Sequence, residues 1–174
     1  FICEPTGNFV RRNILTESAG ILEASNAYAQ MEFLTSSDER FRPVNAYNGP
    51  DGALYLVDFY RGLIQHRLYL TSFLRKQIED RGLYEPIGLG RIYRVVYKGK
   101  DIQPGPKMAQ MSSNQLVEQL SNSNGWHRST AQRLLVERND PATMSQLQLM
   151  ASSGRKPLAR LHALWTLDGM GGAP

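Results

Sequence analysis

The chain has 174 residues, of which 41% are hydrophobic, and this length suffices for one medium domain or two small ones. Its 20 Lys and Arg against 16 Asp and Glu give a formal net charge of +4, a modest excess without a long basic run, which argues against nucleic-acid binding. The single cysteine, Cys3, excludes an internal disulfide and any Cys-x-x-Cys zinc or haem motif within these residues, and no apolar run is long enough to span a bilayer.

The first half of the chain is predicted to consist of short β-strands. Two extended runs, Phe9–Leu15 and Ile21–Ala27, are separated by small and polar residues that end in Gly20, a composition typical of a hairpin connection. Glu32–Thr35 is predicted as a further short strand, which leads into a loop over Ser36–Asn48.

A strong turn signal lies at Asn48–Gly52, where glycines, a proline, Asn and Asp favour a tight reversal. Ala53–Val57 follows as a buried strand, and Arg91–Tyr97 is predicted as the last strand because β-branched and aromatic residues dominate it and glycines bracket it. Short strands separated by turn residues predict an antiparallel all-β architecture for this part of the chain.

Between the last two strands, Arg67–Arg81 is predicted to form an amphipathic helix that ends at Gly82. Its apolar residues recur at helical spacing: Leu70, Phe73, Leu74 and Ile78. A single helix inserted among strands either shapes a site or covers an edge of the sheet.

The composition changes after Tyr97. Lys98–Lys107 contains Gly99, Pro104, Gly105 and Pro106, and residues 100–110 are predicted to link a β domain, residues 1–99, to a helical domain, residues 111–174. Caps and apolar spacing predict four helices in the second domain: Ser113–Leu120, Trp126–Glu137, a segment that starts at Asp140-Pro141, and Pro157–Leu167.

The predicted helices contain an internal repeat. The matched residues are Arg128 and Arg160, Ala131 and Ala163, and Leu135 and Leu167, at an offset of 160 − 128 = 32. A period of this length with two helices per unit is typical of a helical solenoid of the HEAT type. The two units either continue in further repeats or pack against the β domain. The matched alanines are expected at close helix contacts, and Trp126 and Trp165 in the core.

Polar side chains gather at the end of the strand that follows the turn. Asp58, Tyr60 and Arg61 come directly after it and Arg42 precedes the turn, so a loop crossing back from a neighbouring strand would place all four on one rim. This rim offers donors, an acceptor and an aromatic face for a hydroxylated ligand or a quinone carboxylate. In the alternative, structural reading, Arg42 pairs with Asp38 or Asp58 to tie loops together, and the other residues cap the strand and hold the following helix.

His66 follows the same rim and is the histidine best placed for proton transfer. No carboxylate partner is identifiable by spacing, so the alternative is a packing histidine at the start of the predicted helix. His127 and His162 are expected to be polar groups on or between the repeat helices, and Arg128 and Arg160 to bond helix carbonyls or carboxylates. No metal site is predicted in these residues.

An ordered set of motifs carries a family resemblance. In the β part they are Glu4-Pro5-Thr6-Gly7-Asn8-Phe9-Val10, Phe33-Leu34-Thr35-Ser36-Ser37-Asp38, Phe41-Arg42-Pro43-Val44-Asn45, Gly49-Pro50-Asp51-Gly52-Ala53-Leu54-Tyr55, Asp58-Phe59-Tyr60-Arg61 and Gly90-Arg91-Ile92-Tyr93-Arg94-Val95. In the helical part they are Asn124-Gly125-Trp126-His127-Arg128 and Thr130-Ala131-Gln132-Arg133-Leu134-Leu135-Val136-Glu137-Arg138. Over nearly its whole length, the chain resembles the membrane-bound dehydrogenases abundant in Planctomycetes and related bacteria.

The resemblance implies the C-terminal blades of a β-propeller similar to that of soluble pyrroloquinoline-quinone-dependent sugar dehydrogenases, followed by HEAT-like repeats. It also implies pyrroloquinoline quinone with calcium, a c-type haem domain of the same parent protein as electron acceptor, and a periplasmic or membrane-associated location. The catalytic His and the Gly-Pro segment that binds calcium and quinone in those enzymes have no match here, so they belong to other blades or have been lost. Because the chain also begins at Phe1 without an initiator methionine, we expect a fragment.

Two functions from different classes follow. The first is a quinone-dependent dehydrogenase of sugars or alcohols, with His66 as the candidate catalytic residue and Arg42, Asp58, Tyr60 and Arg61 as candidate substrate or cofactor ligands. The second is a noncatalytic scaffold that binds carbohydrate or a protein partner. A shared fold does not separate the two.

Overall fold

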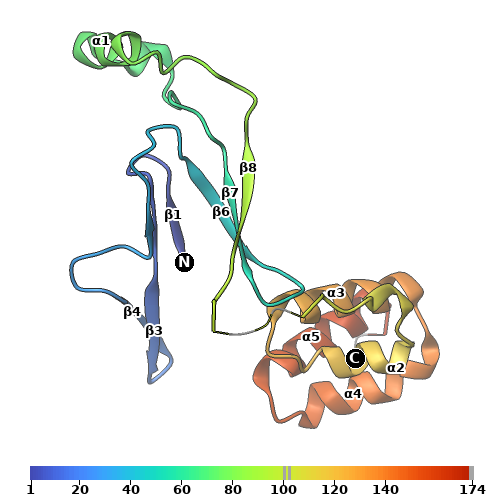
Figure 1. Cartoon of the computed structure of the whole chain (residues 1–174). Helices are drawn as coiled ribbons and strands as arrows, with labels where there is room; N and C mark the ends of the chain where they lie inside the picture. Colours follow the sequence, from blue (N-terminus) through green and yellow to red (C-terminus); the bar gives the residue numbers. More distant parts are fainter. Residues whose placement is uncertain (100, 102, 173–174) are drawn as a thin grey trace. The chain divides into compact units, whose positions relative to one another are not determined.

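The computed structural model describes residues 1–99, 101 and 103–172, and the chain divides into two compact units. The β unit contains residues 1–47 and 54–96, and the helical unit contains the turn at residues 48–53 together with the chain from Tyr97 onward. Residues 100 and 102 of the predicted linker, and residues 173–174 of the predicted helical domain, lie outside the described residues. Antiparallel sheets therefore precede helices along the chain, and the described strands do not close into a barrel or a propeller (Figure 1).

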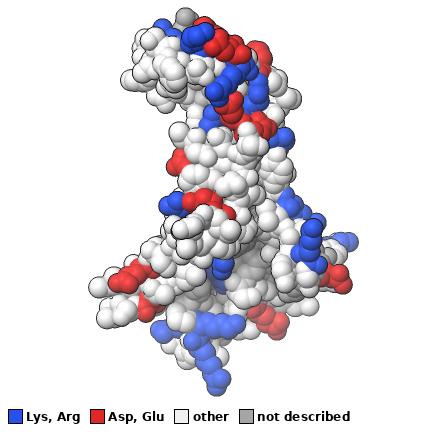
Figure 2. Space-filling model, turned by 60° about the vertical axis from the view of Figure 1, so that its left-hand side comes forward, with Lys and Arg blue, Asp and Glu red and all other residues white. Residues whose placement is uncertain are grey.

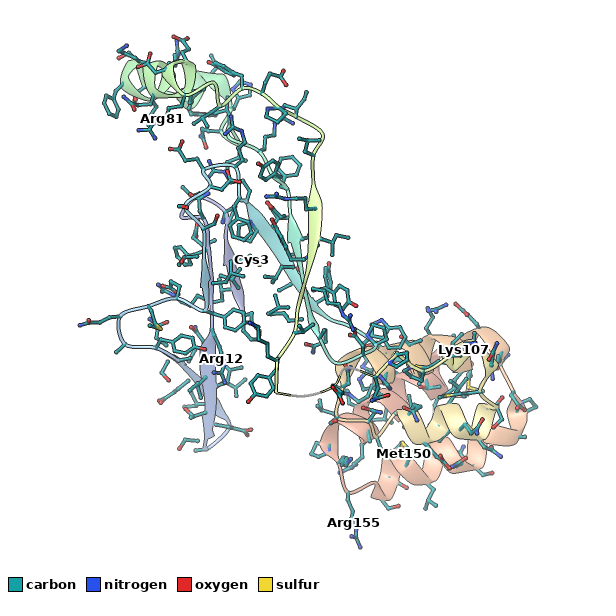
Figure 3. All side chains as sticks on the ribbon, viewed as in Figure 1. Cys3, Arg12, Arg81, Lys107, Met150 and Arg155 are labelled. Atoms are coloured by element: carbon teal, nitrogen blue, oxygen red, sulfur yellow. The ribbon has the colours of Figure 1, made fainter. Side chains whose placement is uncertain are left out.

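Eight strands form three small sheets within the described part of the chain. They are β1 (Ile2–Glu4), β2 (Phe9–Arg11), β3 (Asn13–Ser18), β4 (Ile21–Asn26), β5 (Leu34–Thr35), β6 (Pro43–Asn48), β7 (Leu54–Asp58) and β8 (Arg91–Val95). The strand orders are β1-β2-β5, β3-β4 and β6-β7-β8. The pairs β1–β2, β2–β5, β3–β4 and β7–β8 are antiparallel. Figure 3 marks the half-buried Cys3 on β1, where burial raises the pKa of the thiol.

Two of these strands are absent from the sequence prediction. The loop predicted over Ser36–Asn48 is wrong in its second half, where residues 43–48 form β6, and β1 was not predicted at all. Pro43 stands at the first position of β6, where its missing N–H removes no interior ladder bond. Because β propensity depends on the neighbouring strand more than on the residues themselves, pairing with β7 makes this polar segment a strand.

The hairpin predicted between Phe9–Leu15 and Ile21–Ala27 is confirmed as β3–β4, with a shorter connection than expected, although the first run is divided between β2 and β3. β3 and β4 pair along their whole length, so Ala19 and Gly20 alone form the turn. Both residues have positive φ, 51° and 80°, as a two-residue hairpin turn requires. The large apolar side chains of this hairpin, including Leu15 and Leu22, are exposed.

A helix lies between β7 and β8. It is α1 (Ser72–Asp80), and a 3₁₀ turn at Arg67–Tyr69 precedes it. The Thr71 side chain caps its first turn by accepting a hydrogen bond from the N–H of Leu74 at 3.3 Å. Gly82, with φ of 60°, follows its end, as the sequence predicted.

α1 buries only part of its apolar face. Leu70 and Ile78 are buried in a small cluster with Leu83, whereas Phe73 and Leu74 stay exposed. Basic and acidic side chains lie next to one another over this end of the β unit (Figure 2). The helix is therefore held by a few apolar contacts and by polar contacts to neighbouring loops.

Four α-helices and two 3₁₀ turns form the helical unit within the described residues. They are η2 (Met108–Gln110), α2 (Ser113–Gln119), α3 (Gly125–Arg138), η3 (Pro141–Thr143), α4 (Met144–Ser153) and α5 (Pro157–Gly169). Asn124 and Asp140 cap the turns that follow them, since each side chain accepts a backbone N–H. The cap of α2 is Ser112 rather than the predicted Ser113, and it forms a capping box with Gln115.

The core of the helical unit follows the 32-residue offset. Ala131 and Ala163 are both fully buried, as are Leu135 and Leu167. In contrast, the prediction that Trp165 belongs to the core is wrong, because this side chain is exposed. Ala159, Ala163, Thr166 and Leu167 of α5 face the core instead, and Trp165 lies on the outer side of the helix.

The two repeated arginines bond carbonyl groups, as predicted. Arg128 Nη1 donates to the carbonyls of Asn122 and Ser123 at 2.8 and 2.9 Å, after α2. Arg160 Nε donates to the carbonyl of Ala151 in the last turn of α4 at 2.9 Å. Arg160 therefore stabilises the C-terminal end of α4, where carbonyls lack intrahelical partners, and Arg128 holds the loop between α2 and α3.

The two histidines of the helical unit join separate segments. His127 Nε2 lies 2.9 Å from the carbonyl oxygen of Pro50, in the turn at residues 48–53, and the Asn124 side chain donates to the carbonyl of Gly49 at 2.8 Å. His162 Nδ1 lies 2.7 Å from Gln132 Oε1 between α5 and α3. Burial, and secondly the charge of Arg128, lower the pKa of His162.

Replacing Ala131 with leucine is expected to destabilise the helical unit by about 1 to 3 kcal/mol, because the larger side chain overpacks a fully buried position. Urea unfolding followed by tryptophan fluorescence reports on this unit, which holds both tryptophans. Leucine at the exposed Ala142 is the control and is expected to change the unfolding midpoint little. An equal effect of the two substitutions would contradict close packing at Ala131.

Candidate functional site

The candidate site is built around the carboxylate of Asp58, the last residue of β7. Its side chain is 1% exposed, so each oxygen needs a hydrogen-bond partner. Oδ1 accepts the backbone N–H groups of Arg42 and Tyr60, both at 2.8 Å. Oδ2 accepts Nε and Nη2 of Arg91 at 3.3 and 3.1 Å. One carboxylate thus joins the start of β6, the loop after β7 and the start of β8.

The pairing of β7 with β8 explains why Arg91 is the cation at this carboxylate. Asp58 and Arg91 are direct cross-strand partners in the antiparallel ladder, so their side chains emerge on the same face. Asp38 lies on the other side of Arg91, with 3.9 Å between the charged atoms. Sequence reasoning missed Arg91, which is separated from Asp58 by 33 positions; the signal that could have found it is the strand register.

Arg91 also stacks on aromatic rings. Its guanidinium carbon lies 3.7 Å from the centre of the Tyr60 ring and 5.2 Å from that of Tyr93. Tyr60 has a φ of 45°, a left-handed conformation that is uncommon for a bulky residue. The hydrogen bond from its N–H to Asp58 and the stacked arginine hold it there, so the backbone strain is offset by local contacts.

The Arg42 side chain lies among backbone carbonyl groups. Its Nε donates to the carbonyl of Arg61 at 2.9 Å and its Nη2 to that of Gly62 at 2.7 Å. Nη1 donates to the carbonyls of Pro5 and Thr6 at 2.7 and 3.3 Å. Partial burial lowers the pKa of this guanidinium. Arg42 therefore ties three chain segments together, and its partners are carbonyls instead of the carboxylates of the structural alternative.

The four predicted rim residues do lie together, but Arg61 differs from the other three in its side-chain contacts. Arg42, Asp58 and Tyr60 are held in the hydrogen-bonded network, and Arg61 contributes its carbonyl to it. The guanidinium of Arg61 lies 6.0 Å from the ring of Phe59, and within the described residues it makes no hydrogen bond or ion pair. Arg61 is therefore the rim cation best placed to meet a ligand.

His66, the predicted proton-transfer residue, is exposed and makes local contacts. Its Nδ1 accepts the N–H of Leu68 at 3.3 Å, and its ring lies 6.0 Å from that of Tyr69. These contacts order the start of the 3₁₀ turn before α1, as the packing alternative describes. Its catalytic role stays a prediction.

A pocket of about 440 Å³ adjoins the network on the α1 side. Its apolar wall comes mainly from the η1–α1 segment and the residues flanking it: Leu63, Ile64, Leu70, Phe73, Leu74, Ile78 and Leu83. Arg42, Glu39 and Arg81 supply its charged groups, and Arg81 is ion-paired with Glu39 (Figure 3 marks Arg81). A small concave site with an apolar wall and a few polar groups is suited to a small organic ligand.

Gly62 allows two chain segments that line this pocket to lie close together. A Cβ atom at Gly62 would lie 2.5 Å from the carbonyl oxygen of Leu83, a distance that side-chain carbons do not tolerate. The loop after β7 can approach the end of α1 because residue 62 has no side chain. Arg40, in the loop before β6, also binds the segment after α1 by donating to the carbonyls of Gly82 and Glu85.

The described residues contain no group of three or more His, Cys, Asp or Glu side chains placed to hold a metal ion, and Asp58 already accepts four hydrogen bonds. The single Cys3 cannot supply a c-type haem attachment. Over the same residues, no helix combines the length and apolar character needed to cross a membrane.

These observations define an antiparallel β module whose loops are joined by a buried carboxylate, followed by paired helices. A family model described as a domain of unknown function, DUF7133, matches residues 1–99, and since this is more than half of the chain, the chain belongs to that family. No curated protein and no solved structure matches the chain.

Proposed function

We propose that the chain is part of a quinone-dependent dehydrogenase of sugars or alcohols and contributes the last blades of its β-propeller and its first HEAT-like repeats. In this proposal the parent protein is periplasmic or membrane-associated and passes electrons to a c-type haem domain. Quinone, calcium and haem would be bound by parts of the protein other than the residues described here. No step of the reaction is assigned to this chain.

The observation that carries the proposal is that residues of different resemblance motifs contact one another. Arg42, from one motif, bonds the carbonyls of Pro5 and Thr6 from another and that of Arg61 from a third. Asp58, from the same motif as Arg61, forms an ion pair with Arg91 from a fourth motif. Residues that are far apart in the sequence but meet in one network are best explained by a shared architecture, which is what the resemblance implies.

The role of the chain in such an enzyme is to hold loops in place and to present a ligand surface. The network fixes the loop after β7, which carries Tyr60 and Arg61 and continues along the wall of the pocket beside α1. A guanidinium such as that of Arg61 can donate to the hydroxyl groups of a sugar or to a carboxylate. Rigid placement of such donors is what a binding site requires.

A noncatalytic scaffold that binds carbohydrate or a protein partner is the second candidate. The observation that favours it is the engagement of Arg42 and Asp58 in contacts that join loops, which assigns both side chains to structure. The two candidates share the ligand surface and differ in whether the bound molecule is oxidised.

The deciding experiment uses the intact protein that contains this chain. After incubation with pyrroloquinoline quinone and calcium, we expect reduction of an artificial electron-acceptor dye that depends on an added sugar or alcohol and on the quinone. The absorption spectrum of the same preparation reports haem. Carbohydrate binding in a calorimeter without dye reduction would favour the scaffold, and the absence of both would refute the ligand surface. Arg61→Ala is expected to weaken binding at least about fivefold while leaving unfolding unchanged.

A further inference from the structure

The outer side of α5 carries a row of exposed apolar side chains. Leu158, Leu161, Leu164 and Trp165 are 53%, 49%, 46% and 58% exposed. Soluble helices usually present polar residues to water, and terminal units of helical repeat arrays need a polar outer face for solubility. α5 lacks such a face, so it does not have the character of a terminal helix.

The internal repeat shows which positions of α3 correspond to this row on α5. At the 32-residue offset, Leu161 and Leu164 occupy the positions of Ser129 and Gln132 on α3. Gln132 lies on the face of α3 that α5 covers, since its Oε1 lies 2.7 Å from Nδ1 of His162.

A second contact places the next turn of α3 on the same covered face. A Cβ atom at Gly169 of α5 would lie 2.7 Å from Val136, the residue one turn beyond Gln132. Leu164, in the middle of the exposed row, is therefore the repeat equivalent of a position that already contacts the next helix one unit earlier.

The chain also leaves α3 and α5 in the same way. α3 is followed by Asn139 with φ of 47°, and 32 residues later α5 is followed by Gly171 with φ of 74°. A left-handed residue at a helix end turns the chain away from the helix axis. After α3 this turn leads into α4, the first helix of the next pair.

The geometry points to the exposed row of α5 as the docking face for another helical repeat of the same kind, which packs on α5 as α5 packs on α3. The occupant is a helix pair with small residues on its inner face, like Ala159 and Ala163 of α5. The inference rests on the repeat arrangement of the helices and is independent of the dehydrogenase chemistry, so either can fail without the other.

The test adds one repeat to the whole chain. A second copy of residues 140–171 is joined after Gly171, which preserves the 32-residue spacing. We expect the Tm of the helical unit to rise by about 5 °C or more, and the exchange of the amide hydrogens of α5 to slow about tenfold or more. Leu161→Glu with Leu164→Glu should abolish both effects in the extended chain and change the original chain little.

A matched control is Leu149→Glu on α4. This leucine is also exposed. For α2 and α4, the buried pairs Leu116 with Leu147 and Leu120 with Ala151 set a repeat offset of 147 − 116 = 31. Since 149 − 118 = 31, the repeat equivalent of Leu149 on α2 is Glu118, which is exposed as well. It should therefore affect the original and the extended chain alike.

Three results would overturn the inference. The first is that the added repeat stays unprotected in hydrogen exchange, and the second is that the Leu161 and Leu164 substitutions have an equal effect in both chains. The third is that sedimentation shows the original chain to be a dimer, which dissociates when these leucines are replaced. The last would make a second copy the occupant of the row.

Discussion

Replacing Asp58 with alanine is expected to destabilise the β unit by about 3 kcal/mol, the largest effect among the polar residues of the chain. The substitution leaves the backbone N–H groups of Arg42 and Tyr60 without their acceptor and removes the counter-ion of Arg91. Because Arg91 is partly exposed, water solvates its charge and keeps the loss below that of a fully buried pair.

The two units can be followed separately in one denaturation experiment. Both tryptophans lie in the helical unit, and all tyrosines except Tyr97 lie in the β unit. The Asp58→Ala transition should move to lower urea in the near-ultraviolet circular dichroism of tyrosine and stay in place in tryptophan fluorescence.

Asp38→Asn is the matched control for Asp58. The Asp38 carboxylate contacts the same arginine at 3.9 Å but is 40% exposed, so its loss should cost less than about 1 kcal/mol. Asparagine keeps an oxygen for the N–H of Arg40, which Asp38 Oδ1 accepts at 2.9 Å. Equal destabilisation by the two substitutions would show that the buried carboxylate is not the centre of the network.

Replacing Arg42 with alanine is expected to cost about 2 to 3 kcal/mol in the stability of the β unit, because its charged hydrogen bonds to four carbonyl groups are lost. The same urea experiment measures it. This expectation departs from a ligand-clamp role, in which Arg42→Ala would lower cofactor retention at an unchanged melting temperature. Lysine at position 42 should recover only part of the stability, since one ammonium group cannot reach all four carbonyls on the two segments.

Arg61→Ala is the natural comparison for Arg42→Ala. The two arginines are neighbours on the rim, yet the Arg61 guanidinium makes no hydrogen bond or ion pair within the described residues and lies 6.0 Å from the ring of Phe59. Its replacement should leave the unfolding midpoint nearly unchanged, within about 0.5 kcal/mol. If Arg61→Ala destabilised the unit and Arg42→Ala did not, the roles assigned to the two side chains would have to be exchanged.

The sequence by itself determined the features that local chemistry controls. The caps at Asn124 and Asp140, the helix end at Gly82 and the hairpin turn at Gly20 each depend on residues a few positions away, so their signals are readable in the chain. The 32-residue offset was also readable, because it needs only the recurrence of residue types. It correctly predicted that Ala131 and Ala163 are buried.

Only the tertiary structure decided which polar side chains meet. Asp58 pairs with Arg91 because their strands lie in one register, and neither residue carries a local sign of the other. Pro43–Asn48 becomes a strand because β7 supplies its hydrogen-bond partners, and Arg42 binds carbonyls that two distant segments bring to it. The outward position of Trp165 has the same origin: Ala159, Ala163 and Leu167 of α5 pack against its neighbours, which leaves Trp165 on the other side. Long-range pairing and packing volume, which no window of sequence contains, made these choices.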